Sequence, residues 1–237
     1  MNLKIISWNV RGLNDCEKRL RIQNMIKGWG ANIICLQETK MELITRREIR
    51  SLWGCQHLDW LHLGSIGASR GVLVMWDRRM VEKIDEAVGR FSVSCKFKNV
   101  VDHFVWAFTG VYGPNYDRDK RYSRVYGPII DGNIRQLWEE LAGLDSWCNV
   151  PWCIGSGWGG GGCGGEEFTV VHFPSERWGN KNHKVVGFSE FILEHALLDV
   201  LLEGGAFTCL NNHDSLSMSR LDRFSVSPYR EVCFFLI

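Results

Sequence analysis

Two polar side chains stand directly after apolar runs of the kind that form buried strands. Asn9 ends the run that begins at residue 3, and Glu38 follows the run 33–36 after one glutamine. Ligands of α/β proteins bind outside the carboxyl ends of their strands. A carboxylate beside an amide suits Mg²⁺, which takes few protein oxygens and completes its shell with water or phosphate. The structural alternative is that Asn9 caps a turn and Glu38 is an exposed acid at the start of a helix.

The segment between these two residues must fold back for them to meet. Residues 15–29 have the apolar spacing of a helix, and its expected buried face consists of Leu20, Ile22, Met25, Ile26 and Trp29. A strand–helix–strand unit usually places its two strands side by side and parallel. We therefore expect Asn9 and Glu38 to share one pocket in which a divalent ion could sit.

The rest of the chain contains a mixture of strand–helix units and consecutive strands. Helices are predicted at 42–53, 134–148 and 188–198, and strands at 71–76, 90–97, 104–111, 150–154, 206–210 and 220–226. This order is typical of an α/β layered sandwich with mixed sheets. With 237 residues, the chain fits one large domain, 1–237.

Two stretches interrupt that pattern and are interpreted as insertions. Val-Tyr-Gly-Pro at 111–114 recurs at 125–128, which indicates an irregular insertion near 113–133. Residues 155–165 contain eight glycines in eleven positions, so ordering them costs much entropy and buries few side chains. We expect no packed element there. The G-x-G-x-x-G spacing at 155–160 precedes no helix-forming segment, so a dinucleotide site is not expected.

The composition is that of an ordinary globular protein and excludes several classes. Hydrophobic residues make up 45% and charged residues 23%, which excludes a disordered or fibrous chain. The net charge of +1 gives no global attraction to polyanions, although residues 1–50 carry ten Lys/Arg against five Asp/Glu. No apolar run approaches the about 18 residues of a membrane span, and no signal peptide is recognised. The nine cysteines lack a Cys-x-x-Cys pair, so we expect reduced thiols in an intracellular monomer.

Six ordered segments match the motifs of one family, at 5–13, 37–40, 71–77, 111–115, 173–177 and 220–224. On these segments the chain resembles the endonuclease/exonuclease/phosphatase superfamily. It is most similar to the endonuclease domain of plant LINE-type (non-LTR) retrotransposons, from about Met1 to Pro228. The resemblance implies a four-layer sandwich of two mixed sheets flanked by helices.

The resemblance also implies a reaction, a cofactor and roles for single residues. The expected reaction is hydrolysis of a DNA phosphodiester with Mg²⁺ or Mn²⁺. Glu38 would bind the metal, and Asn9 would support the metal and the phosphate. Tyr112 would contact the scissile phosphate, and Asp222 would orient a catalytic histidine. Tyr112 is preferred to Tyr126 because it directly follows an apolar strand.

The sequence departs from that family in two places. After the strand matching 150–154 the family has Gly-Asp-Phe-Asn, whose Asp activates water and whose Asn holds the phosphate, whereas this chain enters its glycine-rich stretch. Glu167 and Thr169 are the nearest replacements, and we expect both to be out of place. The family's terminal Ser-Asp-His motif is absent, so we expect a missing C-terminal strand and an open sheet edge. The chain is interpreted as a truncated, degenerate copy with weak or no activity.

Two other functions stay open on the sequence alone. One is a non-catalytic nucleic-acid-binding remnant, whose basic residues Arg118, Lys120, Arg121 and Arg124 could grip phosphates. The other is a small-molecule phosphodiesterase or phosphatase of the same superfamily, which the Val-Tyr-Gly-Pro-Asn and Phe-Pro-Ser-Glu-Arg segments disfavour. A DNA partner would place the protein in the nucleus, although the sequence carries no signal for that compartment.

Overall fold

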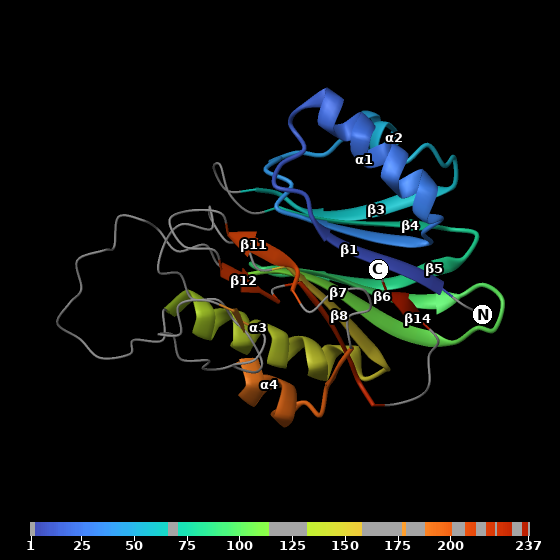
Figure 1. Cartoon of the computed structure of the whole chain (residues 1–237). Coiled ribbons are helices and arrows are strands. Elements are labelled where there is room, and N and C mark those ends of the chain that lie inside the picture. The colour runs from blue at the N-terminus through green and yellow to red at the C-terminus, as the bar shows by residue number, and fades with distance from the viewer. Residues whose placement is uncertain are drawn as a thin grey trace.

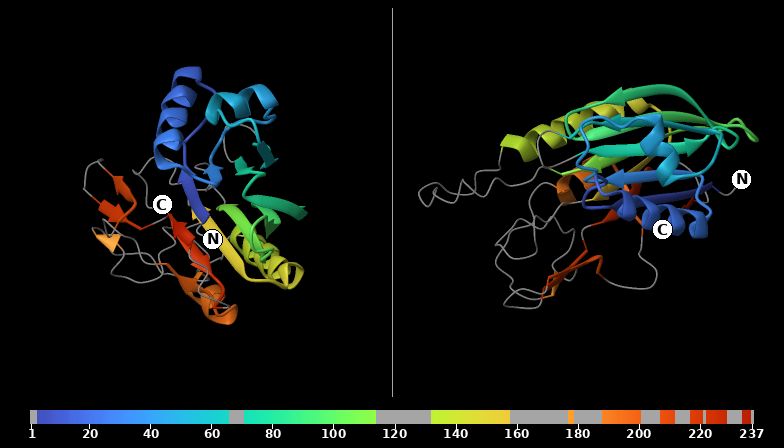
Figure 2. Two further views of the ribbon diagram at one scale, coloured as in Figure 1. Left: turned by 90° about the vertical axis from the view of Figure 1, so that its right-hand side faces the viewer. Right: turned by 90° about the horizontal axis from the view of Figure 1, so that it is seen from above.

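Two stacked β-sheets with helices on both outer sides make up the fold (Figure 1). The computed structural model describes residues 3–65, 71–113, 132–157, 177–178, 188–200, 207–211, 217–220, 222–228 and 234–236. One outer side carries α1 (Cys16–Trp29) and α2 (Arg46–Leu52), and the other carries α3 (Gly132–Cys148) and α4 (Phe188–Glu194). Figure 2 shows the same layers from two further directions. The predicted four-layer α/β sandwich with two mixed sheets is confirmed.

The first sheet has two central strands that are buried along their whole length, as their continuous apolar runs predict. Its order is β14-β1-β2-β4-β3, with the bounds β1 Leu3–Asn9, β2 Ile33–Gln37, β3 Leu58–Leu63, β4 Val72–Asp77 and β14 Phe234–Leu236. β1 and β2 are parallel and pair Asn9 with Gln37 at their carboxyl ends. The α1 helix forms the crossover that such a parallel pair requires.

The second sheet has the order β10-β13-β8-β7-β6-β5. Its strands are β5 Val81–Val88, β6 Ser92–Asn99, β7 Val105–Tyr112, β8 Trp152–Gly157, β10 Leu198–Asp199 and β13 Arg223–Val226. β7 and β8 are parallel and pair Tyr112 with Gly157, whereas β13 runs antiparallel to β8. A small third sheet is formed by β9 Arg177–Trp178, β11 Cys209–Asn211 and β12 Ser217–Ser219.

Large apolar side chains fill the space between the two main sheets. The ring centroid of Phe97 lies 5.3 Å from that of Trp76 and 5.5 Å from that of Trp106. Cys35 faces Gly110 of the opposite sheet, where a Cβ would collide with the cysteine sulfur. Burial raises the pKa of the Cys35 thiol to about 12, so this cysteine packs as an apolar residue and carries no thiolate at neutral pH.

The α1 helix shows where the sequence pattern was right and where it was wrong. Asp15 caps its first turn by accepting a hydrogen bond from the Glu17 N–H at 2.8 Å. Ile22 and Ile26 are buried as predicted. Leu20 and Met25 are instead 56% and 43% exposed, because α1 is a surface helix whose buried stripe is narrower than its apolar content suggests. Within the described ranges, no helix is long and apolar enough to cross a membrane.

Three other predictions about elements need correction. The helix predicted at 42–53 begins only at Arg46, because Thr45 and Glu48 form a capping box there. β3 and β5 are not among the predicted strands. In β5, which forms the edge of its sheet, charged side chains interrupt the apolar pattern. β8 continues through Gly155–Gly157, so the expectation of no packed element is wrong for the first three residues of the glycine-rich stretch.

The expectation of a missing C-terminal strand and an open sheet edge needs correction at β1, where a C-terminal strand is present. β14 pairs in parallel with β1, with Leu3 beside Phe234 and Ile5 beside Leu236. The apolar C-terminal segment therefore supplies hydrogen-bond partners to that edge. Its sequence, Phe-Phe-Leu, has the strand propensity that this pairing needs.

Candidate functional site

The carboxyl ends of the central strands of both sheets meet at one end of the molecule. The side-chain amide of Gln37, the last residue of β2, donates to Ser7 Oγ at 2.6 Å and to the carbonyl of Gly155 in the opposite sheet at 3.3 Å. A Cβ at Gly155 would lie 2.8 Å from Ser7 Oγ. The missing side chain thus lets β8 approach β1 and β2 closely, so that both sheets border one site.

The loops after β1 and β2 are held together by backbone hydrogen bonds. The N–H groups of Val10, Gly12 and Leu13 donate to the carbonyls of Gln37, Glu38 and Thr39, at 3.0, 2.6 and 2.8 Å. Asn9 and Glu38 therefore stand on neighbouring, connected loops, as the strand–helix–strand pattern predicts. The Asn9 side-chain oxygen accepts a hydrogen bond from the Arg11 N–H at 3.1 Å, which fixes the turn.

Three charged residues in these loops adopt the left-handed backbone conformation. Arg11, Glu38 and Lys40 have φ angles of 51°, 55° and 55°. This conformation is uncommon for residues other than glycine and is concentrated at functional sites. The interlocked loops supply the hydrogen bonds that hold it here.

Glu38 is the carboxylate of this half of the site. Its side chain is 12% exposed, and its Oε1 lies 2.9 Å from the Lys40 ammonium nitrogen. Thr39, between the two charges, is buried, and its hydroxyl has no hydrogen-bond partner among the described residues. Thr39 therefore faces the protein interior, between two side chains that are both partly exposed.

Gln37 contributes a buried side-chain oxygen to this region. Its Oε1 accepts no hydrogen bond from the residues that the structure describes. It approaches β8 at Gly157, where a Cβ would lie 2.6 Å from Gln37 Oε1 and 3.3 Å from Asp222 Oδ1. The two side-chain oxygens thus converge on the end of β8. Gln37 was not predicted as a site residue, although a polar residue that ends a wholly apolar strand is a signal that could have found it.

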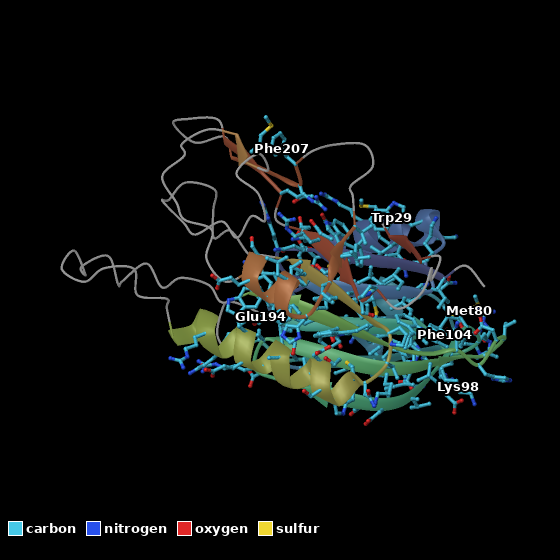
Figure 3. The ribbon with its side chains drawn as sticks, turned by 90° about the horizontal axis from the view of Figure 1, so that it is seen from below. Trp29, Met80, Lys98, Phe104, Glu194 and Phe207 are labelled. Atoms are coloured by element: carbon cyan, nitrogen blue, oxygen red, sulfur yellow. The ribbon has the colours of Figure 1, made fainter. Side chains whose placement is uncertain are left out.

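Asp222 reaches the site from the residue before β13. Its N–H donates to Thr208 Oγ1 at 3.0 Å. Burial raises the pKa of its carboxyl to about 6, and a hydrogen bond with Thr208 and the positive charge of Arg11 oppose part of this rise. Arg11 follows β1, so its influence on Asp222 joins the two sheets electrostatically. Phe207, next to Thr208, lies at the top of Figure 3, well away from the group of Met80, Phe104 and Lys98 at the right.

Of the remaining predicted site residues, the structure describes Tyr112 but not Glu167, Thr169 or Tyr126. Tyr112 ends β7 and is buried, as part of the apolar core between the sheets. No hydrogen bond or ion pair joins Asp222 to a histidine of the described ranges, in which His195 instead pairs with Asp145.

The donor set at this site suits one kind of metal ion. No group of three or more His, Cys, Asp or Glu side chains that could hold a metal occurs in the part of the chain that the structure describes. Glu38 and the amide oxygen of Asn9 supply oxygen donors without nitrogen or sulfur. Such sparse oxygen ligation fits Mg²⁺ or Mn²⁺ with substrate phosphate, and it does not fit a structural zinc ion.

Comparison with known proteins places these observations in a family. Residues 6–155 match the Endonuclease/Exonuclease/phosphatase family. No curated protein matches the chain in sequence. Among solved structures, the AP endonuclease LMAP from Leishmania major is similar with a TM-score of 0.65 and 14% identity, over 94% of this chain and 78% of that one.

Two further structures show how varied the proteins of this fold are. A mannosyl-6-phosphatase from Bacteroides thetaiotaomicron has a TM-score of 0.58 and 14% identity, over 95% of this chain and 85% of that one. The D. rerio protein TDP2, solved with a single-strand DNA product, has a TM-score of 0.54 and 12% identity, over 94% and 82%. At such low identity these likenesses show the fold alone.

Proposed function

Because the chain belongs to the Endonuclease/Exonuclease/phosphatase family, we propose that it is a divalent-metal-dependent phosphoesterase that acts slowly on a DNA phosphodiester. The observation that carries this proposal is the placement of Asn9 and Glu38 on interlocked loops at the carboxyl ends of β1 and β2. This is where the ligands of α/β proteins bind.

The residues of the first sheet would hold the metal and the phosphate. Glu38 and Asn9 would hold Mg²⁺ or Mn²⁺, which supplies positive charge against the phosphate oxygens when bound. Arg11 is exposed and carries a positive charge at the same edge, so it is suited to contact a phosphate. Asp222 would act as a partly buried acid whose raised pKa lets it hold a proton at mildly acidic pH.

The preference for DNA rests on the motif set. The six matching segments resemble the endonuclease domain of plant LINE-type retrotransposons, and we propose that descent for this chain. An AP endonuclease and a protein bound to single-strand DNA share the fold, but so does a sugar phosphatase, so the fold does not choose the substrate. A DNA substrate would place the protein in the nucleus.

The slow rate follows from the end of β8. The resemblance expects an aspartate there to activate water, whereas β8 continues without interruption through Gly155, Ser156 and Gly157. Ser156 is 6% exposed and has no carboxylate, so it cannot act as a general base in the way an aspartate does. The same observation favours the second candidate function, a protein that binds nucleic acid without cleaving it.

Nicking of supercoiled plasmid by the purified chain tests this proposal. We expect slow, Mg²⁺-dependent nicking that EDTA stops. Glu38→Gln should lower it by on the order of a hundredfold, because the cation that stabilises the developing charge would lose its carboxylate ligand. Glu82→Gln is the matched control, because Glu82 is an exposed acid on the distant edge strand β5.

A gel-shift assay beside the nicking assay separates the two candidate functions. A salt-dependent gel shift without any Mg²⁺-dependent nicking would support the binding protein and refute the hydrolase. Nicking that Glu38→Gln leaves unchanged would refute the proposed metal site.

A further inference from the structure

Lys40 is built into the site by its backbone and by its neighbours. Its backbone is left-handed, with φ at 55°. Its methylene stem lies over Gly12, where a Cβ would come within 3.3 Å of Lys40 Cδ. Gly12 has a φ of 102°, which other residues rarely adopt. The glycine thus clears the path along which the lysine reaches Glu38.

The ion pair that results occupies the proposed metal ligand. Lys40 Nζ lies 2.9 Å from Glu38 Oε1, which is within hydrogen-bond distance. The carboxylate is 12% exposed, so water screens the pair less than it screens an exposed one. An ammonium held on Glu38 places a positive charge where a divalent cation would have to approach.

We propose that Lys40 is a tethered counter-cation, which orients and neutralises Glu38 in the metal-free protein and competes with the divalent ion for the same carboxylate. This inference rests on the proposed function, because it takes Glu38 as a metal ligand. Lys40 acts through Glu38 and is therefore a positioning residue. Its consequence is that the protein binds the metal more weakly than its oxygen donors alone would allow.

Binding of Mn²⁺ to the purified full chain, followed by the loss of its free-ion EPR signal, tests the proposal without any turnover. Lys40→Met keeps the stem over Gly12 and removes the charge, and we expect it to tighten Mn²⁺ binding roughly threefold to tenfold, the strength of a partly shielded ion pair. Lys40→Gln should act in the same direction. Lys40→Arg keeps the charge and should stay within about twofold of the wild type.

Lys83→Met is the matched control. Lys83 also pairs with a glutamate, Glu86, but on β5, the edge strand of the second sheet. It should leave Mn²⁺ affinity unchanged. If Glu38→Gln abolishes Mn²⁺ binding while Lys40→Met leaves it unchanged or weaker, the counter-cation is refuted and the metal site stands. If neither the wild type nor Lys40→Met binds Mn²⁺, the metal site of the proposed function fails, and the counter-cation fails with it.

Discussion

The two sheets supply two halves of the candidate site, and the halves differ in the polar and acidic groups that they carry. The loops after β1 and β2 are joined by three backbone hydrogen bonds and present Asn9 and Glu38 together. The end of β8 faces the site with Gly155 and Gly157, and Asp222, an acid beside Gly157, has a pKa raised by burial. The comparison teaches that a half suited to bind metal can persist beside a half that lacks the carboxylate for activating water.

The largest effect is expected from adding a charge at the end of β8. Side chains alternate between the two faces of a strand, so Ser156 faces away from the side on which Gly157 approaches Gln37. Ser156→Asp therefore buries a carboxylate beside Arg223, which already pairs with Asp199, and we expect the free energy of unfolding to fall by about 3–5 kcal/mol with no gain in plasmid nicking. Ser156→Asn, which has the same shape without the charge, should cost less stability. A gain of tenfold or more in nicking by Ser156→Asp would contradict this orientation of the β8 end.

The next effect tests the contact between the halves. Gln37→Leu removes the amide that donates to Ser7 Oγ and to the Gly155 carbonyl across the sheets. Leaving buried polar groups unpaired costs about 1–3 kcal/mol each, so we expect the free energy of unfolding in urea to fall by about 2–3 kcal/mol. A loss below about 0.5 kcal/mol would show that this bridge does not hold the sheets together.

Asp222→Asn tests the electrostatics of the second half through pH. The folded pKa of about 6 lies above the ordinary value of 3.8, so ionisation disfavours the folded state. The wild type should therefore lose stability as the pH rises from about 4 to 6, and the loss should persist above that range. The variant should be more stable than the wild type by roughly 1–2 kcal/mol at pH 7.5 and equal to it near pH 3.5. Equal thermal midpoints at both pH values would show that Asp222 is not shielded from water.

The smallest effect is expected from removing a buried hydroxyl in the first half of the site. Thr39 is buried, and within the described part of the chain its hydroxyl has no hydrogen-bond partner. Thr39→Val has nearly the same shape and removes the unpaired group, so stability should stay equal or rise by up to about 1 kcal/mol. A loss of more than about 1 kcal/mol would instead reveal a partner for the hydroxyl.

The first half of the site could be predicted from the sequence because its signals are local. A strand, a capped helix and a second strand follow one another within residues 3–37, and this order determines which loops meet. The charge pair of Glu38 and Lys40 could not be predicted, because it depends on left-handed backbone angles and on the space over Gly12.

The second half was less predictable because its contacts are distant in sequence. In the sequence, Gly155 and Gly157 belong to a glycine-rich run. In the structure they form the end of β8, where Ser7 and Gln37 of the other sheet pack closely against them. The pairing of β14 with β1 joins the two ends of the described chain, and no short-range pattern indicates it. For Gly155 and Gly157, packing against the other sheet outweighs the entropic cost of ordering that their composition predicts.

Mn²⁺ titration of three proteins tests most directly whether Asn9 and Glu38 hold one divalent ion. The wild type, Asn9→Ala and Glu38→Gln are compared by EPR at one pH and ionic strength. We expect one bound Mn²⁺ per wild-type chain and affinities at least about tenfold weaker in both variants. Wild-type affinity in either variant would contradict this expectation.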